Sequence, residues 1–162
     1  MIGNPDLFGD GHVLPAGQSV YSLIEAGGHN AVPVMLGTNR DETKLFTMMG
    51  PATDKLFGVV PRRAVDARAW ARDNAYGSDL WKARAVDELA DRLVMAQAEG
   101  VYAYRFDVDE WRNLGIIDLK PLLGAAHAME IPFVFGNFPK PSRVVFPGSR
   151  QDEFELISAS MA

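Results

Sequence analysis

The stretch that most constrains the fold is residues 32–42, Val-Pro-Val-Met-Leu-Gly-Thr-Asn-Arg-Asp-Glu. Its apolar first half predicts a strand that is buried on both faces, as in a parallel sheet, and that ends at Gly37. A polar loop follows and ends in two adjacent carboxylates, Asp41 and Glu42. Catalytic groups of open α/β sheets lie just beyond the carboxyl ends of strands. The stretch therefore predicts either half of an acid–base pair or an acidic surface turn, and on its own it favours the turn.

The composition limits the class of protein. The chain has 162 residues, enough for one domain with a substantial core. Hydrophobic residues make up 48% and charged residues 23%, which is typical of a globular domain. The formal net charge of −5 argues against nucleic acid or an anionic membrane as partner. The sequence contains no cysteine, which excludes a disulfide framework and a thiolate nucleophile.

Targeting and cofactor signals are weak throughout the sequence. Residues 1–20 lack a basic segment followed by an apolar core, so we expect no signal peptide and favour a cytoplasmic location. No apolar run is long enough to predict a membrane span. His12, His29 and His127 are scattered and form no metal-binding pair, so we expect no metal and no cofactor.

Hydrophobic periodicity predicts helices that alternate with strands. The two predicted strands are 32–36 and 101–108, and the intervals around them favour helices. The predicted helices cover residues 18–26, a turn at 45–49, 61–76, 78–99 with a break at Gly77, and a final segment from 151. Parallel strands flanked by helices define an α/β class. Two strands buried on both faces need neighbours, so we expect an incomplete sheet that belongs to a larger one.

His127 is the second candidate for a functional residue. It follows the apolar run Leu122-Leu123-Gly124-Ala125-Ala126, and a buried imidazole there needs a hydrogen-bond partner. Glu42 could accept the Nδ1 proton and leave Nε2 free as a general base. The small residues before His127 would also let a backbone or a ligand come close. The alternative is a core histidine bonded to a backbone carbonyl, which the local sequence alone favours.

Two long segments together resemble the type-B carboxylesterase and cholinesterase family. Residues 32–42 resemble the family's acid segment, and residues 123–136, Leu-Gly-Ala-Ala-His-Ala-Met-Glu-Ile-Pro-Phe-Val-Phe-Gly, resemble its histidine segment. The shorter stretch 10–15 resembles the segment before the acid strand, and the start of the final helix is loosely similar to the family's helix after the histidine. The segments occur in the family's order and span most of the chain.

The resemblance implies the C-terminal part of an α/β-hydrolase fold over residues 1–162 and a Ser-Glu-His mechanism that acts on a small ester. By motif position Glu42 would orient the histidine and His127 would be the general base, and the order of acid before histidine agrees with that fold. Asp41 is the neighbour of the aligned acid. Thr43 and Ala128 stand where the family commonly has glycine, which puts the geometry of both loops in question.

The serine nucleophile is the main departure from the family. The sequence contains no G-x-S-x-G, and its nearest approach, Gly17-Gln18-Ser19-Val20-Tyr21, lacks the last glycine. We therefore expect the nucleophile and the oxyanion hole to come from the N-terminal part of the domain, either joined to this chain or as a separate polypeptide. Alone, the chain is predicted to be inactive on esters.

A second functional class remains open, a non-catalytic, cholinesterase-like binding or adhesion module. Retention of both Glu42 and His127 favours the esterase, because binding alone would not need this pair. Trp70, Trp81 and Trp111 are expected to pack in the core or to line a substrate gorge.

Overall fold

The computed structural model describes residues 9–12, 14–97, 100–112, 114–138 and 145–161. The chain forms two compact units, the first made of residues 1–36 and 83–104 and the second of residues 37–82 and 105–162. Each unit is therefore assembled from segments that are distant in sequence.

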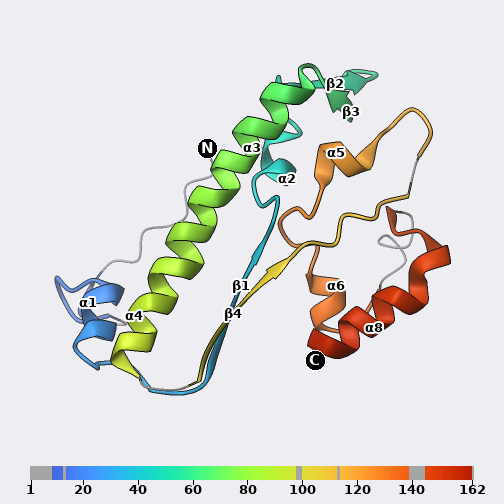
Figure 1. Ribbon diagram of the computed structural model, residues 1–162. Helices are drawn as coiled ribbons and strands as arrows, with labels where there is room; N and C mark the ends of the chain where they lie inside the picture. Colours follow the sequence, from blue (N-terminus) through green and yellow to red (C-terminus); the bar gives the residue numbers. More distant parts are fainter. Residues whose placement is uncertain (1–8, 13, 98–99, 113, 139–144, 162) are drawn as a thin grey trace. The chain divides into compact units, whose positions relative to one another are not determined.

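Strands β1 (Val34–Asn39) and β4 (Val101–Phe106) form a two-stranded parallel sheet, and both begin in the first unit and end in the second (Figure 1). The amide of Val34 donates to the carbonyl of Gly100 at 2.6 Å, and the amide of Arg40 donates to Phe106 at 3.0 Å. The structure confirms a mixed α/β class with parallel strands.

The predicted limits and burial of β1 are wrong. The strand runs through Gly37 to Asn39, and Met35 is 67% exposed, so the apolar run is not covered on both faces. Full burial is reached only at Thr38 and Asn39. An apolar run indicates a strand buried on both faces only if other elements pack on both faces of the sheet. Here the exposure of the side chains alternates from one residue to the next over the first four residues, because successive side chains of a strand point to opposite faces.

Helices α1 (Val20–Glu25) and α4 (Glu88–Ala96) pack against each other in the first unit. Ser19 caps α1 by accepting a hydrogen bond from the Ser22 amide, which confirms the predicted helix there. The guanidinium of Arg92 lies 4.5 Å from the ring centre of Tyr21, a cation–π contact between the two helices. Buried apolar side chains from both helices, among them Leu93, complete this small core.

The predicted break at Gly77 is wrong, because Gly77 lies inside α3 (Ala67–Lys82). A π-helix (Ala83–Asp87) then leads directly into α4. Glycine serves packing at this position: a Cβ on residue 77 would lie 2.9 Å from Cγ2 of Thr43. Ser78, in the same helix, accepts a hydrogen bond from the Thr43 amide at 3.3 Å.

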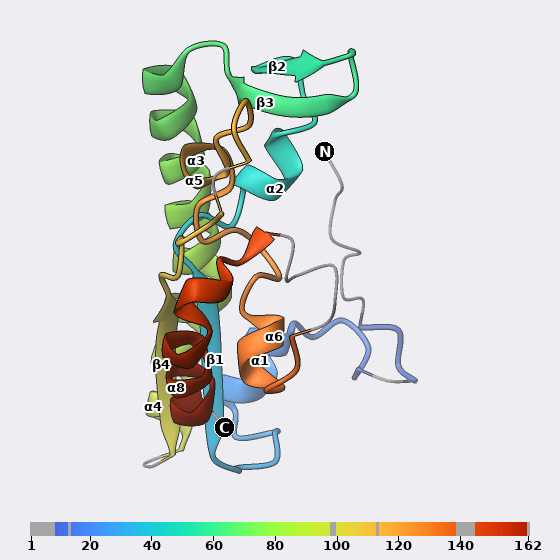
Figure 2. The same ribbon diagram turned by 90° about the vertical axis from the view of Figure 1, so that its right-hand side faces the viewer.

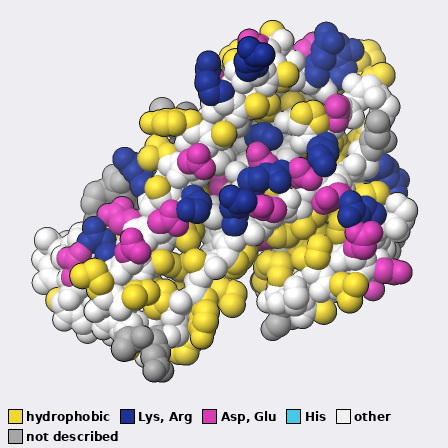
Figure 3. Space-filling model, viewed as in Figure 1, with side chains coloured by type: hydrophobic (Ala, Val, Ile, Leu, Met, Phe, Trp, Pro, Cys, Tyr) yellow, Lys and Arg dark blue, Asp and Glu magenta, His cyan; other side chains and the backbone are white. Residues whose placement is uncertain are grey.

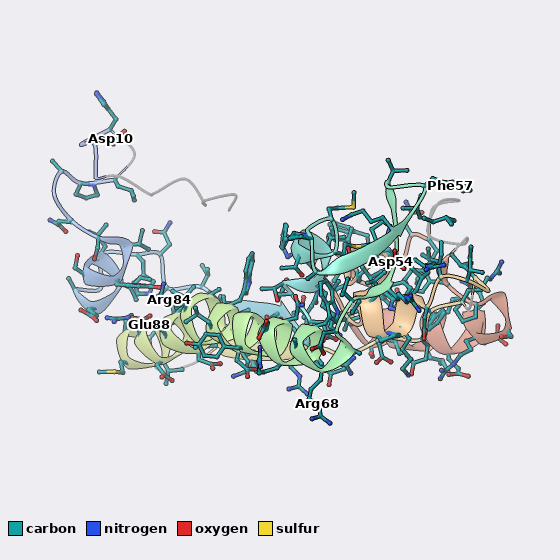
Figure 4. The ribbon with its side chains drawn as sticks, turned by 90° about the horizontal axis from the view of Figure 1, so that it is seen from above. Asp10, Asp54, Phe57, Arg68, Arg84 and Glu88 are labelled. Carbon is teal, nitrogen blue, oxygen red and sulfur yellow. The ribbon has the colours of Figure 1, made fainter. Side chains whose placement is uncertain are left out.

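An antiparallel hairpin occupies residues for which the sequence predicts the start of a helix. Strand β2 (Thr53–Leu56) pairs with β3 (Val60–Ala64), with an irregularity between Asp54 and Lys55. Phe57 and Gly58 both have positive φ, 53° and 74°, which tightens the turn between the strands. Phe57 projects at the outer end of this turn (Figure 4).

The rest of the second unit is built from short helices around an aromatic core. These helices are α2 (Lys44–Thr47), α5 (Leu119–Leu123), α6 (Ile131–Val134), a 3-10 turn (Gly148–Arg150) and α8 (Gln151–Met161). Helix α6 packs on α8 (Figure 2), where the buried rings of Phe133 and Phe154 meet edge to face with centres 5.6 Å apart. The structure confirms the predicted final helix, and this core anchors the segment that follows His127.

The surface in Figure 3 carries acidic and basic side chains next to one another. Within the described residues, no helix combines the length and the apolar character that a membrane crossing requires.

Candidate active site

The structure brings together the two residues that the sequence nominates. Glu42 Oε2 lies 2.7 Å from His127 Nδ1. An ionised carboxylate can only accept, so Nδ1 carries the proton and Nε2 keeps a free lone pair. Glu42 is 4% exposed, whereas the His127 side chain is 39% exposed. Nδ1 is therefore bonded to a buried acid and not to a backbone carbonyl, which was the alternative left open by the sequence.

Glu42 is held from its other side by the residues that end β1. Its Oε1 atom accepts the Asn39 amide at 2.7 Å and the Thr38 hydroxyl at 3.2 Å. A buried carboxylate is costly unless it is hydrogen-bonded, and these contacts meet that requirement. They also fix the direction of the carboxylate toward His127. The extension of β1 to Asn39 thus builds part of the site.

The residues 38–44, which we call the acid turn, bind a second segment, the histidine loop of residues 124–130. Asp41 and Ala125 form a reciprocal pair: the Asp41 amide donates to the Ala125 carbonyl at 2.9 Å, and the Ala125 amide donates to Asp41 Oδ2 at 3.0 Å. The Asn39 side chain donates to the Ala126 carbonyl at 2.8 Å. With Glu42 on His127, the turn contacts three successive residues of the loop.

Asp41 sits in a positively charged environment. Lys44 Nζ lies 2.9 Å from its Oδ1, and Arg40 Nη2 lies 3.0 Å from its Oδ2. Burial raises the pKa of the Asp41 carboxyl, but Lys44, the Ala125 amide and Arg40 outweigh burial and hold the pKa below its ordinary value. Arg40 also pairs with Asp109 at 2.6 Å. The sequence analysis set Asp41 aside as a neighbour, although the flanking Arg40 and Lys44 were visible there.

The histidine loop depends on an unusual backbone at its start and centre. Gly124 has φ +55°, and a Cβ at this position would lie 2.2 Å from Asp41 Oδ2. Its carbonyl accepts the indole proton of Trp111 at 2.7 Å. Ala128, directly after the histidine, also has a positive φ of 67°. The predicted close approach to small residues therefore occurs at Gly124, and the approaching group is the Asp41 carboxylate.

Two aromatic side chains flank the imidazole. The ring centres of Phe46 and Trp81 lie 5.1 Å and 5.3 Å from that of His127, and the two rings stack on each other at 6.1 Å. They restrict the tilt of His127 and give it an apolar border. Sequence reasoning named Trp81 as a core or gorge-wall residue and assigned Phe46 only to a helical turn, so it missed their shared position.

Thr43, the residue after Glu42, is integrated into this site. Its hydroxyl donates to the Asn74 carbonyl at 3.0 Å and lies 3.2 Å from the Ser78 hydroxyl. The threonine thus ties the acid turn to α3. The contact is possible because residue 77 is glycine, which leaves room for the Thr43 methyl group.

No serine nucleophile meets the histidine in the part of the chain that the structure describes. There, Nε2 of His127 has no hydrogen-bond partner, and the two buried serines are engaged elsewhere: Ser78 with Thr43, and Ser158 with the Phe133 carbonyl at 2.6 Å. Among the same residues, no group of three or more acidic or histidine side chains could hold a metal ion.

Comparisons with known proteins were made with protein-family models and with curated sequences. No family model matches this chain, and no curated protein matches it. The geometry of Glu42, His127 and their neighbours is therefore the basis for any assignment of function.

Proposed function

We propose that this chain supplies the acid and the general base of a serine carboxylesterase. The observation that carries the proposal is the 2.7 Å hydrogen bond between Glu42 and Nδ1 of His127, while no described residue hydrogen-bonds to Nε2. In such a mechanism a serine hydroxyl gives its proton to Nε2 while its oxygen attacks the ester carbonyl. The imidazolium that forms is stabilised by the carboxylate, and it then protonates the leaving alcohol.

The surroundings of the pair support this role. Glu42 is fixed through both of its oxygens, so it can hold His127 in one tautomer and one orientation. The partly exposed imidazole can be reached by a nucleophile and a small ester. Phe46 and Trp81 provide an apolar border for uncharged substrate groups. A non-catalytic binding module would not require an oriented imidazole, so the geometry favours the esterase.

The serine has to come from outside residues 1–162, which contain no G-x-S-x-G. The small size of the parallel sheet supports the view that these residues are part of a larger domain. Exposed apolar side chains on β1 and β4, such as Met35 and Tyr102, are suited to packing against further parts of a larger α/β domain. We propose that the N-terminal part of the same domain, linked or separate, provides both the nucleophile and these parts.

The first test is the chain alone with a simple aryl ester. We expect no turnover above that of buffer, because the nucleophile and the oxyanion hole are missing. Turnover that disappears in His127→Ala would contradict the proposal, since it would mean that residues 1–162 contain a complete site.

The second test extends the chain with the coding sequence upstream of residue 1. We expect a G-x-S-x-G segment there and hydrolysis of the same ester by the longer protein. His127→Ala and Glu42→Ala should each lower kcat by roughly 10³-fold or more, by analogy with other hydrolase triads. The control Asp54→Asn, a surface acid of the hairpin, should leave kcat unchanged. Absence of a serine elbow, or full activity in both site variants, would overturn the proposal.

A further inference from the structure

We propose that Asp41 is a positioning residue that holds the histidine loop so that His127 faces Glu42. This inference rests on the proposed esterase function, and it assigns a separate task to the second of two adjacent carboxylates. Asp41 itself does not contact the imidazole; it acts through Ala125, two residues before His127.

Asp41 makes two hydrogen bonds to the loop, and both involve the loop backbone. Ala125 receives a hydrogen bond from the Asp41 amide and donates one to the Asp41 carboxylate, at 2.9 Å and 3.0 Å. Ala125 is fully buried, with 0% exposure, so no water replaces either bond if it breaks. With only Ala126 between Ala125 and His127, a shift of this anchor moves the imidazole directly.

The Asp41 carboxylate has its own supports, which makes it a rigid anchor. Lys44 binds one oxygen, and Arg40 and the Ala125 amide bind the other. Arg40 is in turn held by Asp109, which also pairs with Lys120 at 3.2 Å. These are the charged side chains paired around Asp41 among the described residues. Both of its oxygens are engaged by these partners, which separates its task from that of Glu42.

Gly124 completes the anchor on the other side. A side chain there would overlap Asp41 Oδ2, so only glycine lets the carboxylate reach the loop. The Gly124 carbonyl is fixed by Trp111 at 2.7 Å. The loop is therefore held at residues 124 and 125, close to residue 127, which Glu42 contacts. Catalytic groups need this precision, because small displacements of a positioned base reduce rates severely.

The test measures the tautomer of His127 rather than turnover. In the 162-residue chain labelled with ¹⁵N-histidine, the nitrogen chemical shifts at a pH where the imidazole is neutral report whether Nδ1 or Nε2 carries the proton. We expect the Nδ1–H form to predominate in the wild type and to lose that predominance in Glu42→Ala. Asp41→Asn should also lose it, although Glu42 is intact. The matched control Asp54→Asn should keep the wild-type tautomer.

A milder variant keeps the test informative if Asp41→Asn fails to fold. Lys44→Gln removes one partner of the carboxylate and leaves both Ala125 bonds, so the tautomer should shift partway. Unchanged tautomers in the folded variants at positions 41 and 44, with a shift in Glu42→Ala, would overturn the positioning role and leave the proposed function standing. A wild type without the Nδ1–H form would overturn the pair itself, and with it the proposed function.

Discussion

The acid turn and the hairpin each contain an aspartate bound by two cationic side chains, yet they differ in what that aspartate supports. Asp41 pairs with Arg40 and Lys44 and has a side chain only 12% exposed. Asp54 pairs with Arg62 and Arg63 on a side chain 35% exposed. Of the two, Asp41 alone also binds the backbone of a distant segment among the described residues. Charge pairing at the surface adds little, whereas a buried pair with backbone partners determines tertiary structure.

The same contrast applies to a glycine in each region. Gly124 faces Asp41, whereas Gly58 in the hairpin turn has open space where a Cβ would be. Both have positive φ, 55° and 74°, and Gly124 in addition has ψ −150°, a conformation that is essentially open only to glycine, so alanine brings strain at both positions and most at Gly124. Gly124 therefore combines backbone strain with a close contact, whereas Gly58 has strain without a contact.

The largest effect is expected from Gly124→Ala. Backbone strain together with overlap on a buried carboxylate should lower the free energy of unfolding by about 3 kcal/mol or more. Gly58→Ala should lower it by only about 1 kcal/mol, from strain alone. Urea unfolding of the two variants measures the difference. Equal losses would show that the carboxylate moves aside at little cost and is not a rigid anchor.

An intermediate effect is expected from Asp41→Asn, and it should depend on pH. At pH 7 the loss of ion pairs and of a charged acceptor should cost about 2 kcal/mol. The folded pKa of Asp41 lies below that of the unfolded chain, near 3.8. The carboxylate's contribution to stability is thus complete above that unfolded value and disappears as the pH falls through it toward the folded pKa. The stabilities of the wild type and Asp41→Asn should therefore begin to converge as the pH falls below about 4.

Asp54→Asn is the control for this pH dependence. Arg62, and to a lesser degree Arg63, hold the pKa of Asp54 below its ordinary value against the opposing effect of desolvation, but the exposed pair is screened by solvent. Its stability should follow the wild type closely at every pH. Urea unfolding at pH 7, 5 and 3 measures all three proteins. A gap between the wild type and Asp41→Asn that is as large at pH 3 as at pH 7 would contradict an ionised Asp41 as the source of stability.

The pairing of Glu42 with His127 was predictable because each residue lies in a long segment with its own signal. Residue 42 follows an apolar run, and residue 127 is a titratable side chain in apolar sequence. The structure places the two 2.7 Å apart. Their catalytic role stays a prediction, because hydrogen-bond geometry alone does not test it.

The parts that were not predicted depend on contacts between distant residues. Gly77 reads as a helix break locally, but it lies within α3, where the missing side chain leaves room for Thr43. Pro61 reads as a helix start, but it lies in β3 opposite Lys55. The role of Asp41 toward Ala125 also requires a partner 84 residues away. Local propensity contains no information about such partners.

The smallest effect is expected at two non-glycine residues with positive φ, Ala128 in the histidine loop and Phe57 in the hairpin. Glycine removes the backbone strain at each position, but it also increases the entropy of the unfolded chain, which offsets part of this benefit. The free energy of unfolding of both variants should therefore rise by about 0.5–1 kcal/mol. Phe57 is 89% exposed and loses little packing. Thermal unfolding measures both gains. A gain at Phe57→Gly with a loss at Ala128→Gly would mean that the Ala128 methyl group stabilises the loop. Equal gains would instead show that His127 is followed by a strained residue which the anchors at Asp41 and Glu42 hold in place.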